Sequence, residues 1–247
     1  MTNSRQIIRL LVAVAVVAAA GCASTSSRVA KVETQASQAA MTPQLALERL
    51  IEGNERFVSG RTLNRDLGAQ VRATAGGQYP FASVISCLDS RTSTELIFDQ
   101  GIGDVFNGRI AGNFINEHLL GSLEFASKVV GARLIVVVGH TQCGAVMGAC
   151  DNVQLGHVTS VVQQIRPAVE AVRDVPGERS SRNHAFVDRV ARANVELTVA
   201  AILARSDILR EMAEKGEIGV IGAMYDLVTG RVEFFPPATP NLMLVGR

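Results

Sequence analysis

Apolar and polar positions along the chain follow two periods, one typical of buried strands and one typical of amphipathic helices. Short apolar runs have the composition of strands buried on both faces, and longer stretches between them place apolar residues at helical spacing. The predicted strands cover residues 81–86, 105–108, 133–140 and 217–223. The predicted helices cover residues 43–60, 117–130, 158–173 and 185–215. The segment "YDLVTGRVEFF" has the pattern of a hairpin. Strands that alternate with helices predict a single α/β domain with a mostly parallel central β-sheet flanked by helices.

The first 40 residues have a different pattern. Arg5 and Arg9 precede an apolar run at residues 10–20, which is shorter than the roughly 20 residues of a transmembrane helix and predicts a signal peptide. The run ends in "AAGC", which resembles a bacterial lipobox and implies lipid attachment at Cys22. An ordinary cleaved signal and an uncleaved anchor are the alternatives, because Ala19 stands where leucine is commonest.

These features predict a signal peptide at residues 1–22, a flexible tether at 23–40, which is rich in Ser, Thr, Ala and Gln, and a folded domain at 41–247. The protein is expected on the periplasmic side of the cell envelope with a lipid anchor. Ala23 rather than aspartate follows the cysteine, which favours the outer membrane.

Composition excludes several classes of protein. The chain has 247 residues, a formal net charge of +1, 4% aromatic residues and no tryptophan, so it has neither the basic surface nor the stacking residues of a nucleic-acid-binding protein. With 47% hydrophobic residues it has enough apolar side chains for a full core. Four cysteines in a chain of this length do not form a disulfide scaffold.

Candidate chemistry follows two of the predicted strands. In "CLDSR", Cys87, Asp89 and Arg91 occupy alternate positions, and "GHTQCGA" adds His140 and Cys143 at the end of the strongest strand. The carboxyl ends of parallel strands share one edge of the sheet, where ligands bind. Two cysteines and one histidine suit Zn²⁺ with an open fourth position. A disulfide between the two cysteines is the alternative in an exported protein.

The two motifs, with Cys87 and His140 separated by 53 positions (87 to 140), resemble the C-x-D-x-R and H-x-x-C signature of the β-class carbonic anhydrases. The similarity extends from about Pro43 to Phe235. It implies a zinc ion held by Cys87, His140 and Cys143, with water in the fourth place, or Asp89 if the site is closed. It also implies reversible hydration of CO₂ to bicarbonate and a proton by a zinc-bound hydroxide. Arg91 would hold Asp89 off the metal, so that Asp89 orients the hydroxide.

The resemblance implies further residues and partners. Gln78, Phe106, Ala111 and Gly144 would line the substrate pocket. The minimum assembly would be a homodimer, or a tetramer, with the helix that starts at Pro43 packed on a partner subunit. Two alternative functions keep the zinc: hydrolysis of COS or CS₂, and a non-catalytic lipoprotein that zinc only stabilises.

Overall fold

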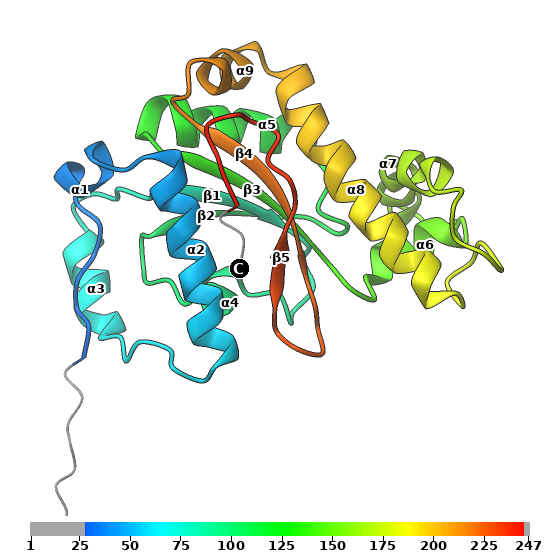
Figure 1. Ribbon diagram of the computed structural model, residues 1–247, viewed down its shortest axis with the longest axis horizontal. Helices are drawn as coiled ribbons and strands as arrows, with labels where there is room; N and C mark the ends of the chain where they lie inside the picture. Colours follow the sequence, from blue (N-terminus) through cyan, green and yellow to red (C-terminus); the bar gives the residue numbers. More distant parts are fainter. Residues whose placement is uncertain (1–27, 245–247) are drawn as a thin grey trace, which may run out of the picture.

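The computed structural model describes residues 28–244, which form one five-stranded sheet flanked by helices on both faces (Figure 1). The strands are β1 (Ala82–Ser86), β2 (Val105–Arg109), β3 (Leu134–His140), β4 (Gly219–Tyr225) and β5 (Val232–Phe234). Their order is β2-β1-β3-β4-β5, with the first four parallel and β5 antiparallel to β4. The predicted α/β class, the mostly parallel sheet and the hairpin are therefore confirmed.

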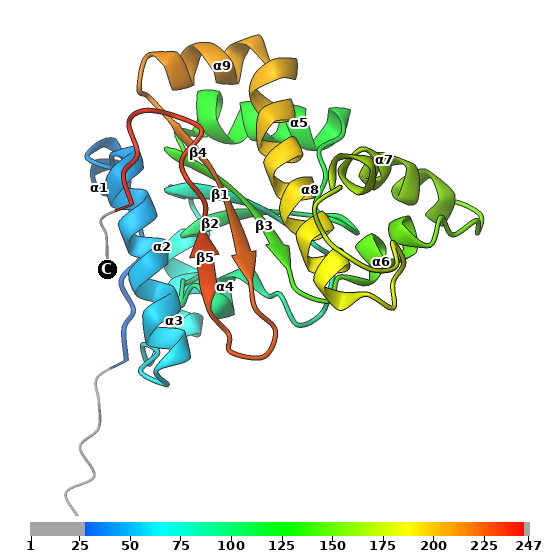
Figure 2. The ribbon, with the colours of Figure 1, turned by 45° about the vertical axis from the view of Figure 1, so that its right-hand side comes forward.

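The strands are buried because their side chains supply two hydrophobic cores, one on each face of the sheet. Every residue of β1, β3 and β4 is buried. Ile135 and Val137 of β3 face a core shared with the later helices, whereas Val136 faces a core shared with α2. Figure 2 shows these two helical layers on opposite sides of the sheet. Burial on both faces explains why these runs are continuously apolar rather than alternating.

The helices match the predicted periodicity with some differences at their ends. They are α1 (Gln35–Ala39), α2 (Pro43–Val58), α3 (Leu67–Thr74), α4 (Thr94–Ile97), α5 (Glu117–Glu124), the π-helix η1 (Phe125–Val130), α6 (Gly144–Cys150), α7 (Val158–Ala171), α8 (His184–Arg205) and α9 (Asp207–Glu214). Ser206 divides the single helix predicted at 185–215, because its extended backbone ends α8 and its hydroxyl accepts the Leu209 N–H at the start of α9. No helix within residues 28–244 is both long and apolar enough to cross a membrane.

One prediction about the N-terminal part needs correction. The tether predicted at 23–40 is ordered from residue 28, because Thr34 and Ser37 form a capping box on α1 and the buried Gln38 donates to the Pro80 carbonyl. The helix that starts at Pro43 buries the face that carries Leu47 and Leu50 within its own chain, and its predicted contact with a partner subunit stays a prediction. Leu47 and Leu50 of α2 are 0% exposed in the core that includes Val136. The predicted signal peptide lies outside the described residues.

Gly53 of α2 allows this helix to approach α4. A Cβ at this position would lie 1.8 Å from the Phe98 carbonyl oxygen, which is backbone and cannot rotate away. Gly53→Ala is therefore expected to lower the free energy of unfolding by about 3 kcal/mol. Gly121→Ala on α5 is the matched control, since no atom lies within 4 Å of its added Cβ. Equal urea midpoints for the two variants would show that α2 does not depend on this close approach.

Candidate metal centre

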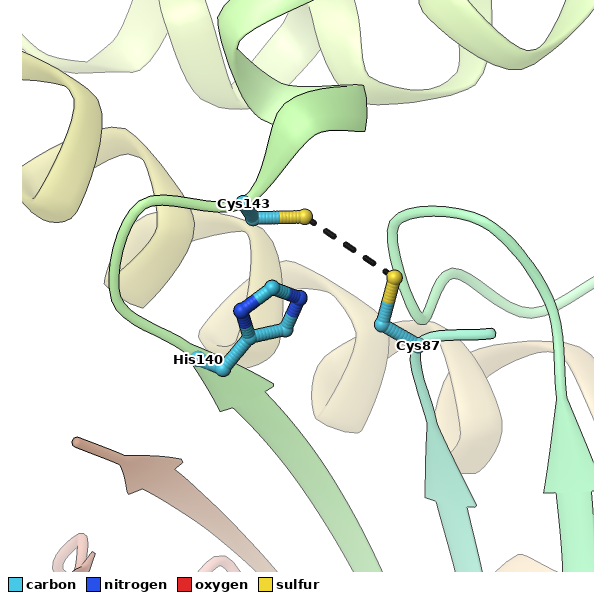
Figure 3. A group of neighbouring side chains, drawn as sticks. All are labelled: Cys87, His140 and Cys143. Atoms are coloured by element: carbon cyan, nitrogen blue, oxygen red, sulfur yellow. Dashed lines mark hydrogen bonds between the residues drawn. The ribbon is translucent and has the colours of Figure 1, made fainter. Parts of the chain in front are cut away.

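Three side chains suited to a metal meet at the carboxyl edge of the sheet. Cys87 directly follows β1, and His140 is the last residue of β3. The two strands are adjacent and parallel, so their ends lie side by side. Cys143, the N-cap of α6, completes the group. The three ligand atoms lie within 4.8 Å of one another and all three residues are buried (Figure 3).

The turn between His140 and Cys143 is held by a contact from α8. Gln142 has a positive φ of 52°, a backbone conformation that costs free energy for a residue other than glycine. Its N–H donates to the Asp188 carboxylate at 3.0 Å. This bond helps to keep Cys143 directed toward Cys87.

The geometry fits a zinc ion better than a disulfide. The two sulfur atoms are 3.9 Å apart, whereas a disulfide bond is about 2.05 Å long. Two thiolates on a tetrahedral zinc, each about 2.3 Å from the metal, would be roughly 3.8 Å apart. His140 Nδ1 donates to the Thr141 carbonyl at 2.9 Å, and its buried Nε2 has no hydrogen-bond partner. An imidazole oriented in this way presents Nε2 as a metal ligand.

The two thiols influence each other strongly because they are buried together. The hydrogen bond from the Cys143 thiol is the main reason that the pKa of Cys87 is lowered, and the same bond raises the pKa of Cys143. His140 and the Gly112 N–H, which lies 3.4 Å from Cys87 Sγ, also lower the pKa of Cys87. The surroundings therefore favour a thiolate at Cys87, the form that binds metals.

Asp89 and Arg91 form a bidentate pair beside this group. Arg91 Nε donates to Asp89 Oδ1 at 2.9 Å and Arg91 Nη2 donates to Oδ2 at 2.7 Å. Arg91 is the main reason that the pKa of the Asp89 carboxyl lies well below its usual range. Oδ2 is 3.9 Å from His140 Nε2. An ionised carboxylate thus borders the metal group while remaining bound to Arg91.

Comparison with known proteins identifies this arrangement. A sequence profile of the family described as "Carbonic anhydrase" matches residues 82–232. "Carbonic anhydrase 2" of Mycobacterium tuberculosis is 40% identical over 195 residues, which cover 76% of this chain and 91% of that protein. The crystal structure of the β-carbonic anhydrase CafA of Aspergillus fumigatus aligns with a TM-score of 0.60 and 26% identity, over 79% of this chain and 91% of that one.

The chain belongs to the β-carbonic anhydrase family. A β-carbonic anhydrase from Sordaria macrospora, described as tetrameric, has the same fold with a TM-score of 0.58 at 24% identity, over 68% of this chain and 90% of that one. The enzyme class predicted from the two motifs is therefore confirmed.

The residues predicted to line the substrate pocket are placed differently with respect to the metal group. Ala111 and Gly144 are next in sequence to Gly112 and Cys143 and so lie beside the group. Phe106 is half-buried on β2 opposite Ser83, and Gln78 is exposed in the loop between α3 and β1. Their assignment to the β-carbonic anhydrase pocket stays a prediction. Cys22, predicted to carry a lipid, lies outside the described residues.

Two residues that were not predicted from the sequence donate hydrogen bonds to backbone carbonyls beside the metal group. Arg109, at the end of β2, donates from Nε to the Cys87 carbonyl at 3.0 Å and from Nη2 to the Asp89 carbonyl at 2.5 Å. Asn194 of α8 donates to the Gly112 carbonyl at 2.7 Å. Arg109 could have been found from the sequence, because it directly follows a predicted strand. No sequence motif includes Asn194.

Proposed function

We propose that this β-carbonic anhydrase hydrates CO₂ with a zinc ion held by Cys87, His140 and Cys143. The observation that supports it most directly is the buried, unpartnered Nε2 of His140, which faces two sulfur atoms at a separation suited to tetrahedral zinc. A bound zinc ion acts as a Lewis acid and lowers the pKa of a coordinated water from 15.7 to roughly 7. The protein must then orient that water and supply an apolar approach for CO₂.

Asp89 supplies the orientation. Two hydrogen bonds from the Arg91 side chain hold its carboxylate in one position and keep it ionised, so Oδ2 can accept the O–H of a water beside His140. The same bonds restrain Asp89 from becoming a metal ligand itself. Apolar side chains complete the site, because CO₂ has no charge to be paired; Phe106 and Ala111 are the residues proposed for this wall.

Metal removal tests the proposal. The purified protein is expected to contain about one zinc ion per chain, to lose CO₂ hydration on chelation and to regain it when zinc is returned. Zinc content is measured by mass spectrometry and hydration by stopped flow. If the zinc-loaded protein does not hydrate CO₂ but hydrolyses COS or CS₂, those compounds are its substrates instead. Absence of zinc from reduced, zinc-supplied protein would contradict the proposal.

Arg109 is proposed as a positioning residue for this reaction. Its guanidinium bridges two carbonyl groups of the Cys87–Asp89 segment, and the shorter ammonium of lysine cannot contact both. Arg109→Lys is expected to lower kcat roughly 10- to 100-fold while zinc stays bound. Arg192→Lys is the matched control, since Arg192 pairs with Glu233 on the surface. Equal kcat values in stopped flow for Arg109→Lys and the unmodified enzyme would exclude this role.

The location and assembly of the enzyme are further proposals. The charged and apolar N-terminal pattern and "AAGC" support export and lipid attachment at Cys22 on the periplasmic side. Mass spectrometry of the N-terminal peptide would detect the lipid, and Cys22→Ser should release the protein from the membrane fraction. A homodimer or tetramer is proposed by resemblance to the family, with molar mass from light scattering as its test.

A further inference from the structure

The face formed by α3 exposes apolar side chains next to the point where the described chain begins. Leu67 and Val71 are one helical turn apart on α3 and are 52% and 54% exposed. Leu63, just before the helix, is 41% exposed. We call these three residues the α3 patch. Exposed apolar side chains are common on protein surfaces, so what distinguishes the α3 patch is its position beside the N-terminal segment and the charges around it.

The N-terminal segment runs along the α3 patch. The Val29 N–H donates to the Asn64 carbonyl at 2.7 Å, and the Asp66 N–H donates to the Val29 carbonyl at 3.0 Å. Gln70 of α3 also donates to the Lys31 carbonyl at 3.0 Å. Figures 1 and 2 both show the chain entering the domain beside α3, at the end of the molecule away from α7. Whatever precedes residue 28 is therefore attached next to the patch.

Charge around the patch is predominantly positive. Arg61 and Arg72 flank it, and Arg28 and Lys31 of the N-terminal segment are exposed beside it. Between residues 60 and 77 the single acidic residue is Asp66, whose carboxylate caps α3 by accepting the Ala69 N–H. Four other carboxylates lie nearby: those of Glu33 and Asp99 are paired with arginines, and those of Glu52 and Asp104 line the same hollow as Lys31 and Leu63. The patch thus combines apolar side chains with an excess of cations over carboxylates, the combination that binds anionic lipid surfaces.

The chain length between Cys22 and Arg28 limits the distance between a lipid on Cys22 and the α3 patch. Six residues span at most about 20 Å, whatever their conformation. A lipid on Cys22 would therefore keep the α3 end of the domain within that distance of the bilayer, which lets the patch reach the surface, where its cations act over a Debye length of about 8 Å.

We infer that the α3 patch rests on the surface of an anionic phospholipid bilayer, with Leu67 and Val71 in the interface. This inference depends on the proposed lipid attachment at Cys22 and adds an orientation to it. The enzyme would then be held with α3 toward the membrane and α7 toward the aqueous side. A second copy of the chain is the competing occupant of the patch, and the experiment below separates the two.

The absence of tryptophan makes the orientation measurable. Leu67→Trp places a single fluorophore on the patch, and Val158→Trp places one at the start of α7, where Val158 is 44% exposed. Each full-length lipoprotein variant is reconstituted into vesicles that contain phosphatidylglycerol and brominated lipid. We expect the Trp at position 67 to shift to shorter wavelength and lose at least half of its emission, while the Trp at position 158 is unchanged. Vesicles without anionic lipid, or high salt, should reduce the quenching at 67.

Three outcomes would overturn the inference. If the protein floats with vesicles but shows equal quenching at positions 67 and 158, lipid attachment is supported and the proposed orientation is rejected. A wavelength shift at 67 that occurs without vesicles and rises with protein concentration would assign the patch to a second copy. Protein that does not float would remove both the anchor and the orientation. CO₂ hydration measured on the same samples in detergent tests the proposed activity separately, because neither position belongs to the metal group.

Discussion

Cys143→Ser is expected to abolish both zinc binding and CO₂ hydration, with the rate falling by roughly a thousandfold or more. The serine hydroxyl remains protonated at neutral pH and is a poor zinc ligand, so only two of the three proposed ligands would remain. Cys143 is 1% exposed and its sulfur lies 3.9 Å from that of Cys87, and Asp89, the other donor beside the group, is held by Arg91. Zinc content and stopped-flow rates measure the two effects.

Cys150→Ser is the control that separates ligand loss from damage to the core. Cys150 is the last residue of α6 and is 8% exposed, whereas Cys143 caps the start of the same helix. Burial is the main reason that the pKa of Cys150 is raised to about 11. Its thiol therefore stays protonated at neutral pH, and the protonated form does not bind metals. This variant should keep zinc and activity. Retention of both by Cys143→Ser as well would refute the proposed ligand set.

The sequence predicted the metal group because its members follow from local rules. Cys87 and His140 each end a strongly apolar run, and parallel strands place such ends at one edge of the sheet. Cys143 is close to His140 in sequence, so its position required only a short turn. The family signature then indicated the chemistry. The fold class was predictable for the same reason, since burial on both faces leaves a continuous apolar pattern in each central strand.

Other features depend on tertiary packing and could not be predicted from local pattern. Arg109 supports Cys87 only because β2 pairs with β1 in the register that places Ser86 opposite Arg109. Asn194 contacts Gly112 across 82 positions of sequence. The partner of α2 was also ambiguous, because an apolar helical face shows that something covers it but does not show which chain does. Leu47 and Leu50 contact the core of their own chain.

Asp89→Ala is expected to lower CO₂ hydration roughly 10²- to 10⁴-fold, the range typical of a positioned proton acceptor, while zinc stays bound. Asp89 is not one of the three ligand residues, and Arg91 holds its carboxylate outside the group. Asp89→Asn is the closer comparison, because the amide has nearly the same shape but no charge. Its rate should be similar to that of Asp89→Ala if an ionised acceptor is required. Full activity of Asp89→Ala would exclude this role.

Arg91→Gln distinguishes the charge of Asp89 from its position. Arg91 lowers the pKa of the Asp89 carboxyl, so removal of the guanidinium should raise that pKa toward the ordinary value of about 3.9. A carboxyl with a lowered pKa stays ionised as the pH falls, and the variant should therefore lose activity at a higher pH than the unmodified enzyme on the acid side. At neutral pH Asp89 remains ionised in both proteins. A large loss of rate there would consequently come from a carboxylate that is charged but no longer held away from the metal ligands, which is the part of the mechanism that Arg91 provides.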